Sequence, residues 1–181
     1  MTARRPHLLL IGLRGSGKST VGRRLAERER EAFTDLDREV LSHLRCTTVA
    51  EVWETLGEPA FRRAETEVLG TLLAGHPGII ALGGGTPTAP GAADLISEAR
   101  ASGRVRVVYL RCQPNELAAR LRGAVGPDRP PLLGTDALTE MEEVFNRRDG
   151  LYQRLADVVI EGMASIEETV DGVERAWSGG Q

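Results

Sequence analysis

The sequence predicts an α/β fold, with a five-stranded parallel sheet flanked by helices on both faces. Three observations lead to this prediction. Short apolar runs alternate with stretches of helical periodicity. The first run, "HLLLI" at residues 7–11, has no alternation of polar and apolar positions, as expected of a parallel strand covered on both faces. Glycines or acids follow the first three predicted strands, at the sheet edge where α/β proteins bind ligands.

The predicted strands are five short runs at residues 7–11, 32–37, 79–82, 105–110 and 157–160. Helices are expected at residues 18–30, 91–101, 114–122 and 138–155, and from residue 165 onward. Two further helices are expected between residues 48 and 74, separated by a break at residues 56–59. Capping-box patterns begin two of them, at Thr48 and Ser165, and Pro114 stands in the first turn of a third. Residues 1–181 show no repeat or linker, so we expect one domain.

Composition and charge limit the kinds of molecule that the protein is expected to bind. The formal net charge of −3 argues against nucleic acid or an anionic membrane as the main partner. No run approaches the ~20 apolar residues of a membrane span, and the basic-then-apolar start lacks the other features of a signal peptide. The two cysteines are far apart in sequence, which disfavours a disulfide framework or a zinc site. We expect a cytoplasmic monomer that acts on small molecules.

Residues 12–19 match the phosphate-binding pattern G-x-x-x-x-G-K-[ST] between a predicted strand and a predicted helix. The glycines let backbone N–H groups point at phosphate, and the helix adds its positive end. Lysine reaches the outer phosphates and the serine hydroxyl binds Mg²⁺. The predicted nucleotide and metal contacts are Arg14, Gly15, Ser16, Gly17, Lys18, Ser19 and Thr20. GTPases, ATPases and small-molecule kinases share this loop, so the acceptor stays open at this point.

The second predicted strand ends in Asp35 and Asp37. On an extended chain, residues i and i+2 point to the same side, so one carboxylate can face a metal while the other faces an acceptor hydroxyl. The third and fourth predicted strands end in glycines and in Arg111, so the metal carboxylate is expected from Asp35. Alone, a D-x-D pattern would favour a turn with an exposed helix cap, but the phosphate loop reverses that preference.

Seven motifs together carry a resemblance to a known family. They are "GLRGSGKST", "FTDLD", "GEPAFRRAE", "LGGG", "VVYL", "DRPPLL" and "RRDGLY", in order between about residues 8 and 160. With them the chain resembles the shikimate kinases, which have the P-loop kinase fold of the nucleoside-monophosphate-kinase-like group. The resemblance implies Mg²⁺-dependent transfer of the ATP γ-phosphate to the 3-hydroxyl of shikimate, a step of the chorismate pathway to the aromatic amino acids.

The resemblance also implies roles for individual residues. Asp37 contacts the acceptor hydroxyls and acts as base, and Asp35 lies near Mg²⁺. The substrate carboxylate is held by Arg62 and Arg148, and the ring lies against the backbone of Gly83, Gly84 and Gly85. The acceptor-binding region spans about residues 37–65. A lid at about residues 123–135 brings Arg129 to the ATP phosphates, and Arg122 lies against adenine.

General chemistry agrees with these roles. Guanidinium groups bind a carboxylate through two parallel hydrogen bonds. Arg62 and Glu65 are three residues apart on a predicted helix, so Glu65 can hold the guanidinium in place. Taken alone, Arg62 would be read as a surface residue. Two other functions stay open: a gluconate-kinase-like enzyme, and a nucleotide-binding module without catalysis, which should have lost Asp37 or Arg62.

Overall fold

A computed structural model describes residues 5–122, 137–162 and 165–179. Its five strands are β1 (His7–Ile11), β2 (Phe33–Asp35), β3 (Ile79–Ala81), β4 (Val105–Arg111) and β5 (Val158–Glu161). They form one sheet in the order β2-β3-β1-β4-β5, and every neighbouring pair is parallel. The predicted fold class is therefore confirmed.

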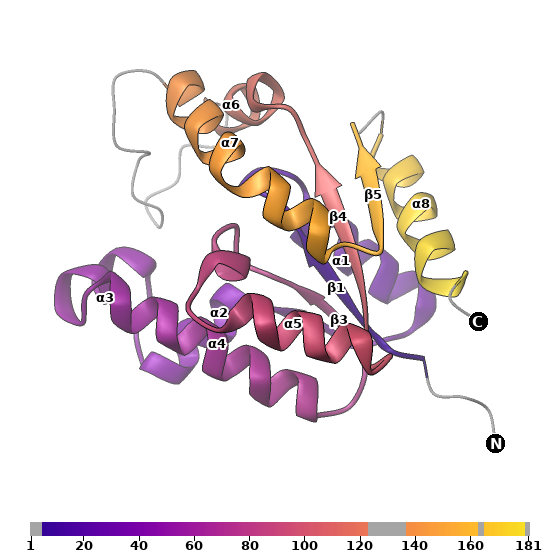
Figure 1. Cartoon of the computed structure of the whole chain (residues 1–181), viewed down its shortest axis with the longest axis horizontal. Helices are drawn as coiled ribbons and strands as arrows, with labels where there is room; N and C mark the ends of the chain where they lie inside the picture. The colour runs from indigo at the N-terminus through magenta and orange to yellow at the C-terminus, as the bar shows by residue number, and fades with distance from the viewer. Residues whose placement is uncertain (1–4, 123–136, 163–164, 180–181) are drawn as a thin grey trace.

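Helices cover both faces of this sheet (Figure 1). They are α1 (Lys18–Glu29), α2 (Leu36–Leu44), α3 (Val49–Thr55), α4 (Glu58–Ala74), α5 (Ala92–Ala101), α6 (Pro114–Arg122), α7 (Ala137–Leu155) and α8 (Ile166–Ser178), with a 3-10 turn η1 (Thr86–Thr88). Both predicted caps are confirmed: the Thr48 and Ser165 hydroxyls each accept from a backbone N–H three residues on, at 3.1 Å. Within the part described, no helix is long and apolar enough to cross a membrane.

One predicted element is wrong. The strand expected at residues 32–37 ends at Asp35, and Asp37 lies in the first turn of α2, a helix that was not predicted. Leu36 and Val40 are one helical turn apart and both are fully buried, so burial favours the helix over a longer strand. An acidic side chain in the first turn is also favoured by the helix dipole.

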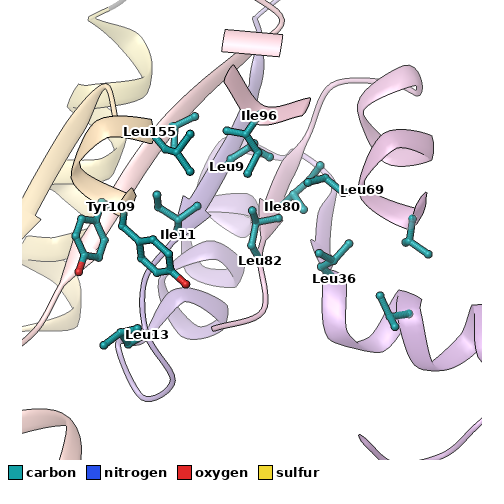
Figure 2. Close-up of a cluster of buried hydrophobic side chains, with 14 of the residues drawn as sticks. Leu9, Ile11, Leu13, Leu36, Leu69, Ile80, Leu82, Ile96, Tyr109 and Leu155 are labelled. Atoms are coloured by element: carbon teal, nitrogen blue, oxygen red, sulfur yellow. The ribbon is translucent and has the colours of Figure 1, made fainter. Parts of the chain in front are cut away.

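The sheet separates two apolar cores. Leu8 and Leu10 of β1 pack with residues of α1 and α8, whereas Leu9 and Ile11 pack with α4, α5 and α7. Figure 2 shows the second of these clusters. Its labelled residues include Leu9, Ile11 and Ile80 from the strands, and Leu69 of α4 and Ile96 of α5. Alternate residues of β1 thus enter opposite cores, which explains why the run has no polar alternation. Cys112 is buried in the second cluster, Cys46 is partly exposed, and both are free thiols.

The contact between α1 and β2 depends on a glycine inside the helix. A Cβ on Gly22 would lie 2.5 Å from Cε2 of Phe33 and 3.2 Å from Cδ1 of Leu10. Gly70, in the interior of α4, differs: a Cβ there would lie 3.7 Å from Leu95, an ordinary contact distance. Packing therefore requires glycine at position 22 but not at position 70.

We predict opposite effects for the same substitution at these two glycines. Gly22→Ala should destabilise the protein by about 1–3 kcal/mol, because the added methyl group overpacks the core. Gly70→Ala should stabilise it by about 0.5–1 kcal/mol, because alanine has the better helix propensity. Urea unfolding of the two variants and the wild type measures both. A stabilised Gly22→Ala protein would contradict the packing argument.

A second prediction concerns pH. His7 is buried, its Nδ1 has no hydrogen-bond partner, and burial, assisted by Arg104, lowers its pKa from the ordinary value of 6.5. The unfolded chain therefore takes up a proton at a pH where the folded protein does not, so stability falls as pH drops below about 6.5. His7→Leu should lose less stability than the wild type between pH 7 and pH 5 in urea unfolding. His43→Gln, at an exposed position, is the control and should keep the wild-type loss.

Candidate active site

The phosphate loop joins β1 to α1 in a conformation that depends on its glycines. Gly12, Gly15 and Gly17 all have positive φ, a region that side chains other than glycine rarely adopt. The buried Lys18 Nζ donates to the carbonyl oxygens of Gly12 at 2.8 Å and Leu13 at 3.0 Å. The loop is thus folded around its own lysine, at the N-terminus of a 12-residue helix. Such a helix start binds anions.

Ser19 and Asp35 meet beside this loop. The Ser19 hydroxyl donates to Oδ2 of Asp35 at 2.7 Å. Asp35 is the N-cap residue of α2, yet its side chain makes no capping bond, since it faces α1 instead. A hydroxyl and a carboxylate are the hard oxygen donors that suit Mg²⁺, which is usually held by one or two protein oxygens plus substrate phosphates. Among the described residues, no group of three His, Cys, Asp or Glu could hold a metal alone.

Asp35 and Asp37 both line a cavity of about 660 Å³ between α1, α2 and residues 46–49. Ser19, Arg23 and Arg38 line it as well. The expectation that the two carboxylates face one space therefore holds, although the reason given for it does not. A strand-to-helix junction, rather than an extended i, i+2 pair, turns both side chains toward the cavity.

Gly83, Gly84 and Gly85 lie where the residues predicted to bind the acceptor meet the phosphate loop. A Cβ on Gly84 would lie 2.8 Å from the backbone N of Arg14, inside the phosphate loop. A Cβ on Gly83 would collide with Oδ1 of Asp37, and one on Gly85 with the guanidinium of Arg62. None of the three has a positive φ. Close approach by three different neighbours, rather than turn geometry, thus accounts for the triplet.

Arg62 is held in place as the i, i+3 spacing predicted. Its Nη1 donates to Oε2 of Glu65 at 2.8 Å, and the other oxygen of Glu65 accepts from Thr86 at 2.6 Å. Glu65 is almost fully buried, so the ion pair is shielded from solvent. The opposite edge of the guanidinium, Nε and Nη2, donates to one oxygen of the more exposed Glu58 at 3.2 and 3.1 Å.

Arg148 reaches the same place from α7. Its Nη1 donates to the carbonyl oxygen of Gly84 at 3.0 Å, and the hydroxyl of Tyr152 donates to the same oxygen at 2.8 Å. A guanidinium carries five N–H donors, so this bond leaves donors that could serve the predicted contact to a substrate carboxylate. Tyr152 was missed by sequence reasoning, because its partner is distant along the chain.

The residue after Arg148 ties α7 to the sheet. Asp149 accepts two hydrogen bonds from Arg111, at 2.8 and 2.9 Å, and one from the Tyr109 hydroxyl at 2.9 Å. Burial alone would raise the pKa of Asp149, but the bonds from Arg111, Tyr109 and Gln153 outweigh it and lower that pKa. Asp149 is therefore a charged anchor beside Arg148, and sequence reasoning did not identify it.

Some predicted residues lie outside this cluster or outside the described residues. Arg129 and the lid at 123–135 belong to the part of the chain that is not described, and Arg122 ends α6 with its side chain also undescribed. Thr20 is exposed on α1. One further contact to the phosphate loop was not predicted: Arg120 of α6 donates to the carbonyl oxygen of Gly15 at 3.3 Å.

Comparisons with known proteins agree with this geometry. The family model described as Shikimate kinase matches residues 14–176. The chain is 38% identical over 156 residues to a shikimate kinase of Mycobacterium avium (strain 104), covering 86% of this chain and 84% of that protein. It is 34% identical over 174 residues to one from Cupriavidus pinatubonensis, covering 96% and 86%.

Solved structures agree as well. Shikimate kinase from Acinetobacter baumannii in complex with shikimate superposes with a TM-score of 0.86 at 28% identity, covering 98% of this chain and 95% of that one. A gluconokinase from Sinorhizobium meliloti 1021 reaches only 0.57 at 17% identity, over 97% and 93%, and shares the fold alone. The match to the family model and the identity to these relatives show that the chain belongs to the shikimate kinase family.

Proposed function

We propose that the protein transfers the γ-phosphoryl group of ATP to the 3-hydroxyl of shikimate, giving ADP and shikimate 3-phosphate. The observation that carries this proposal is the glycine triplet. Residues 83–85 contact the phosphate loop on one side and Asp37 and Arg62 on the other. A donor phosphate and an acceptor hydroxyl bound to these groups would be neighbours, as in-line transfer requires.

On the donor side, the phosphate loop and Lys18 bind the triphosphate. Lys18 is buried and faces the loop, so its ammonium group is in place to neutralise the outer phosphates. Ser19 and Asp35 would hold Mg²⁺, the serine as a ligand and the aspartate directly or through water. Magnesium, when bound, neutralises charge that develops on the β- and γ-phosphate oxygens.

On the acceptor side, Asp37 accepts the proton of the attacking hydroxyl. The bond from this hydroxyl oxygen to the γ-phosphorus forms as the bond between that phosphorus and the β,γ-bridging oxygen breaks, and ADP leaves. Arg62 and Arg148 hold the substrate carboxylate. Buried Glu65 orients the first arginine and the carbonyl of Gly84 orients the second. Both cations are therefore ordered before the substrate binds.

The alternatives each lack support. For a gluconate-kinase-like enzyme the gluconokinase likeness is one of fold alone, at 17% identity, whereas the shikimate kinases are similar in sequence as well. A binding module without catalysis should have lost Asp37 or Arg62, and both stand beside the triplet. The lid, with Arg129 on the phosphates and Arg122 on adenine, and the acceptor region at 37–65 stay predictions, as does a single domain.

A monomeric, cytoplasmic enzyme also stays a prediction. The free thiols of Cys46 and Cys112 are compatible with a reducing compartment. Light scattering on the purified chain tests the oligomeric state.

A coupled assay of ADP release tests the reaction itself. Run with shikimate, with gluconate and without an acceptor, it should show turnover that depends on shikimate and on Mg²⁺. ADP release that is equal in all three arms would refute the proposal, and preference for gluconate would support the first alternative.

We predict that Asp37→Asn lowers kcat by roughly 10²–10⁴, since the acceptor hydroxyl loses its base. ATP binding, measured by calorimetry, should persist. Asp94→Asn, at an exposed position on α5, is the control and should leave kcat unchanged. A variant with wild-type kcat would exclude Asp37 as the base.

Replacing Arg62 by Lys should raise the KM for shikimate by about 10-fold or more, because an ammonium group cannot make the two-point bond to a carboxylate. The KM for ATP should stay near that of the wild type. Arg63→Lys changes the next residue of α4, which is exposed, and serves as the matched control. Equal KM values for shikimate in the two variants would show that Arg62 is a surface arginine with no role in binding shikimate.

A further inference from the structure

Tyr152 occupies an unusual place in the acceptor site. Its side chain is fully buried, and Tyr152 does not line the cavity between α1, α2 and residues 46–49. Its hydroxyl nevertheless lies among the groups that are proposed to bind the acceptor. It donates to the Gly84 carbonyl at 2.8 Å, and its charged neighbours include Arg148, Arg62 and Glu65. A residue placed in this way acts through its neighbours.

Two donors from one helix face meet at the Gly84 oxygen. Arg148 and Tyr152 are four residues apart on α7, so they project from the same side of the helix. A carbonyl oxygen has two lone pairs, and these two bonds occupy both. The peptide plane that joins Gly84 to Gly85 is thereby fixed, and the N–H on the other side of this plane is fixed with it.

The protonation state of Tyr152 suits this role. Burial raises its pKa to about 12, so the hydroxyl keeps its proton and stays a donor throughout the pH range of an enzyme assay. Its ring packs edge-to-face on Tyr109, with the ring centroids 5.5 Å apart and an interplanar angle of 79°. This contact holds the ring independently of the hydroxyl.

The position of α7 does not depend on Tyr152. Asp149 is fixed by Arg111 and Tyr109 from β4, and Arg111 also lies 5.0 Å from the centre of the Phe145 ring, one turn earlier on the helix. Removing the Tyr152 hydroxyl would therefore leave the helix in place. The change would be confined to the Gly84 carbonyl and the guanidinium that shares it.

We propose that Tyr152 is a positioning residue for the acceptor: its hydroxyl shares the Gly84 carbonyl with Arg148 and so sets both the glycine backbone and the arginine that receive the substrate carboxylate and ring. This inference rests on the proposed shikimate kinase activity. Without the hydroxyl, Gly84 accepts from Arg148 alone, so the guanidinium is drawn toward the backbone and away from the substrate.

The test compares two variants, each of which removes the hydroxyl of one tyrosine. Tyr152→Phe should raise the KM for shikimate about five- to tenfold, the size expected for one hydrogen bond, with the KM for ATP unchanged. Tyr109→Phe is the matched control. It also removes a buried hydroxyl, from the other ring of the same aromatic pair, but Asp149 keeps both bonds from Arg111. Its KM for shikimate should equal that of the wild type.

A second measurement separates positioning from general destabilisation. In an Arg148→Lys background, Tyr152→Phe should raise the KM for shikimate by a smaller factor than in the wild type, because the part of its effect that acts through the arginine is gone and only the part that acts through the Gly84 backbone is left. The inference would be wrong if Tyr152→Phe raised the KM for shikimate by the same factor with and without Arg148→Lys. It would also be wrong if Tyr152→Phe and Tyr109→Phe raised this KM equally. Neither result would contradict the proposed activity of the wild type. A wild-type protein without shikimate-dependent ADP release would overturn the proposed function and this inference together.

Discussion

The active site depends on a stretch of backbone that has no room for side chains. Gly83, Gly84 and Gly85 run between the phosphate loop and the acceptor residues, and a Cβ on any of them would come too close to a neighbour. The neighbour of Gly84 is the backbone of Arg14, which cannot move without moving the phosphate loop. The spacing between the donor and acceptor halves is therefore set by backbone packing, which is far stiffer than contacts between long side chains.

Charges in the site are organised differently from charges on the surface. The two arginines proposed to bind the acceptor have a buried or backbone partner, Glu65 for Arg62 and Gly84 for Arg148. On the outside, Arg28 of α1 pairs with three acids of α8: Glu167, which is exposed, and Asp171 and Glu174, which are partly exposed. Such exposed pairs contribute little to stability and weaken with salt. The inner pairs lose orientational freedom before the substrate binds, which favours a defined geometry.

Features with a local signal were predictable from sequence. The phosphate loop, the two caps and the Arg62–Glu65 pair each lie within a few residues, and the structure has them where the spacing indicated. The predicted end of β2 was wrong, although the sequence has apolar residues at helical spacing, Leu36 and Val40, which could have indicated α2. The contact between Tyr152 and Gly84 joins residues 68 positions apart, and no local pattern reports such a pair. The sequence predicted that a substrate ring approaches the backbone of the glycine triplet, and this stays a prediction. The close approach of three protein neighbours to residues 83–85 could be found only from the fold.

The bond between Arg62 and Glu58 has a consequence for how an acceptor enters. The Nε and Nη2 edge of this guanidinium already binds a carboxylate, supplied by the chain itself. A substrate carboxylate that takes this edge replaces Glu58, so binding is an exchange of one anion for another on a single cation. The affinity is then a difference between two similar interactions and is lower than the strength of either. If Arg62 binds the substrate as proposed, Glu58 gives its guanidinium a partner whenever the substrate is absent.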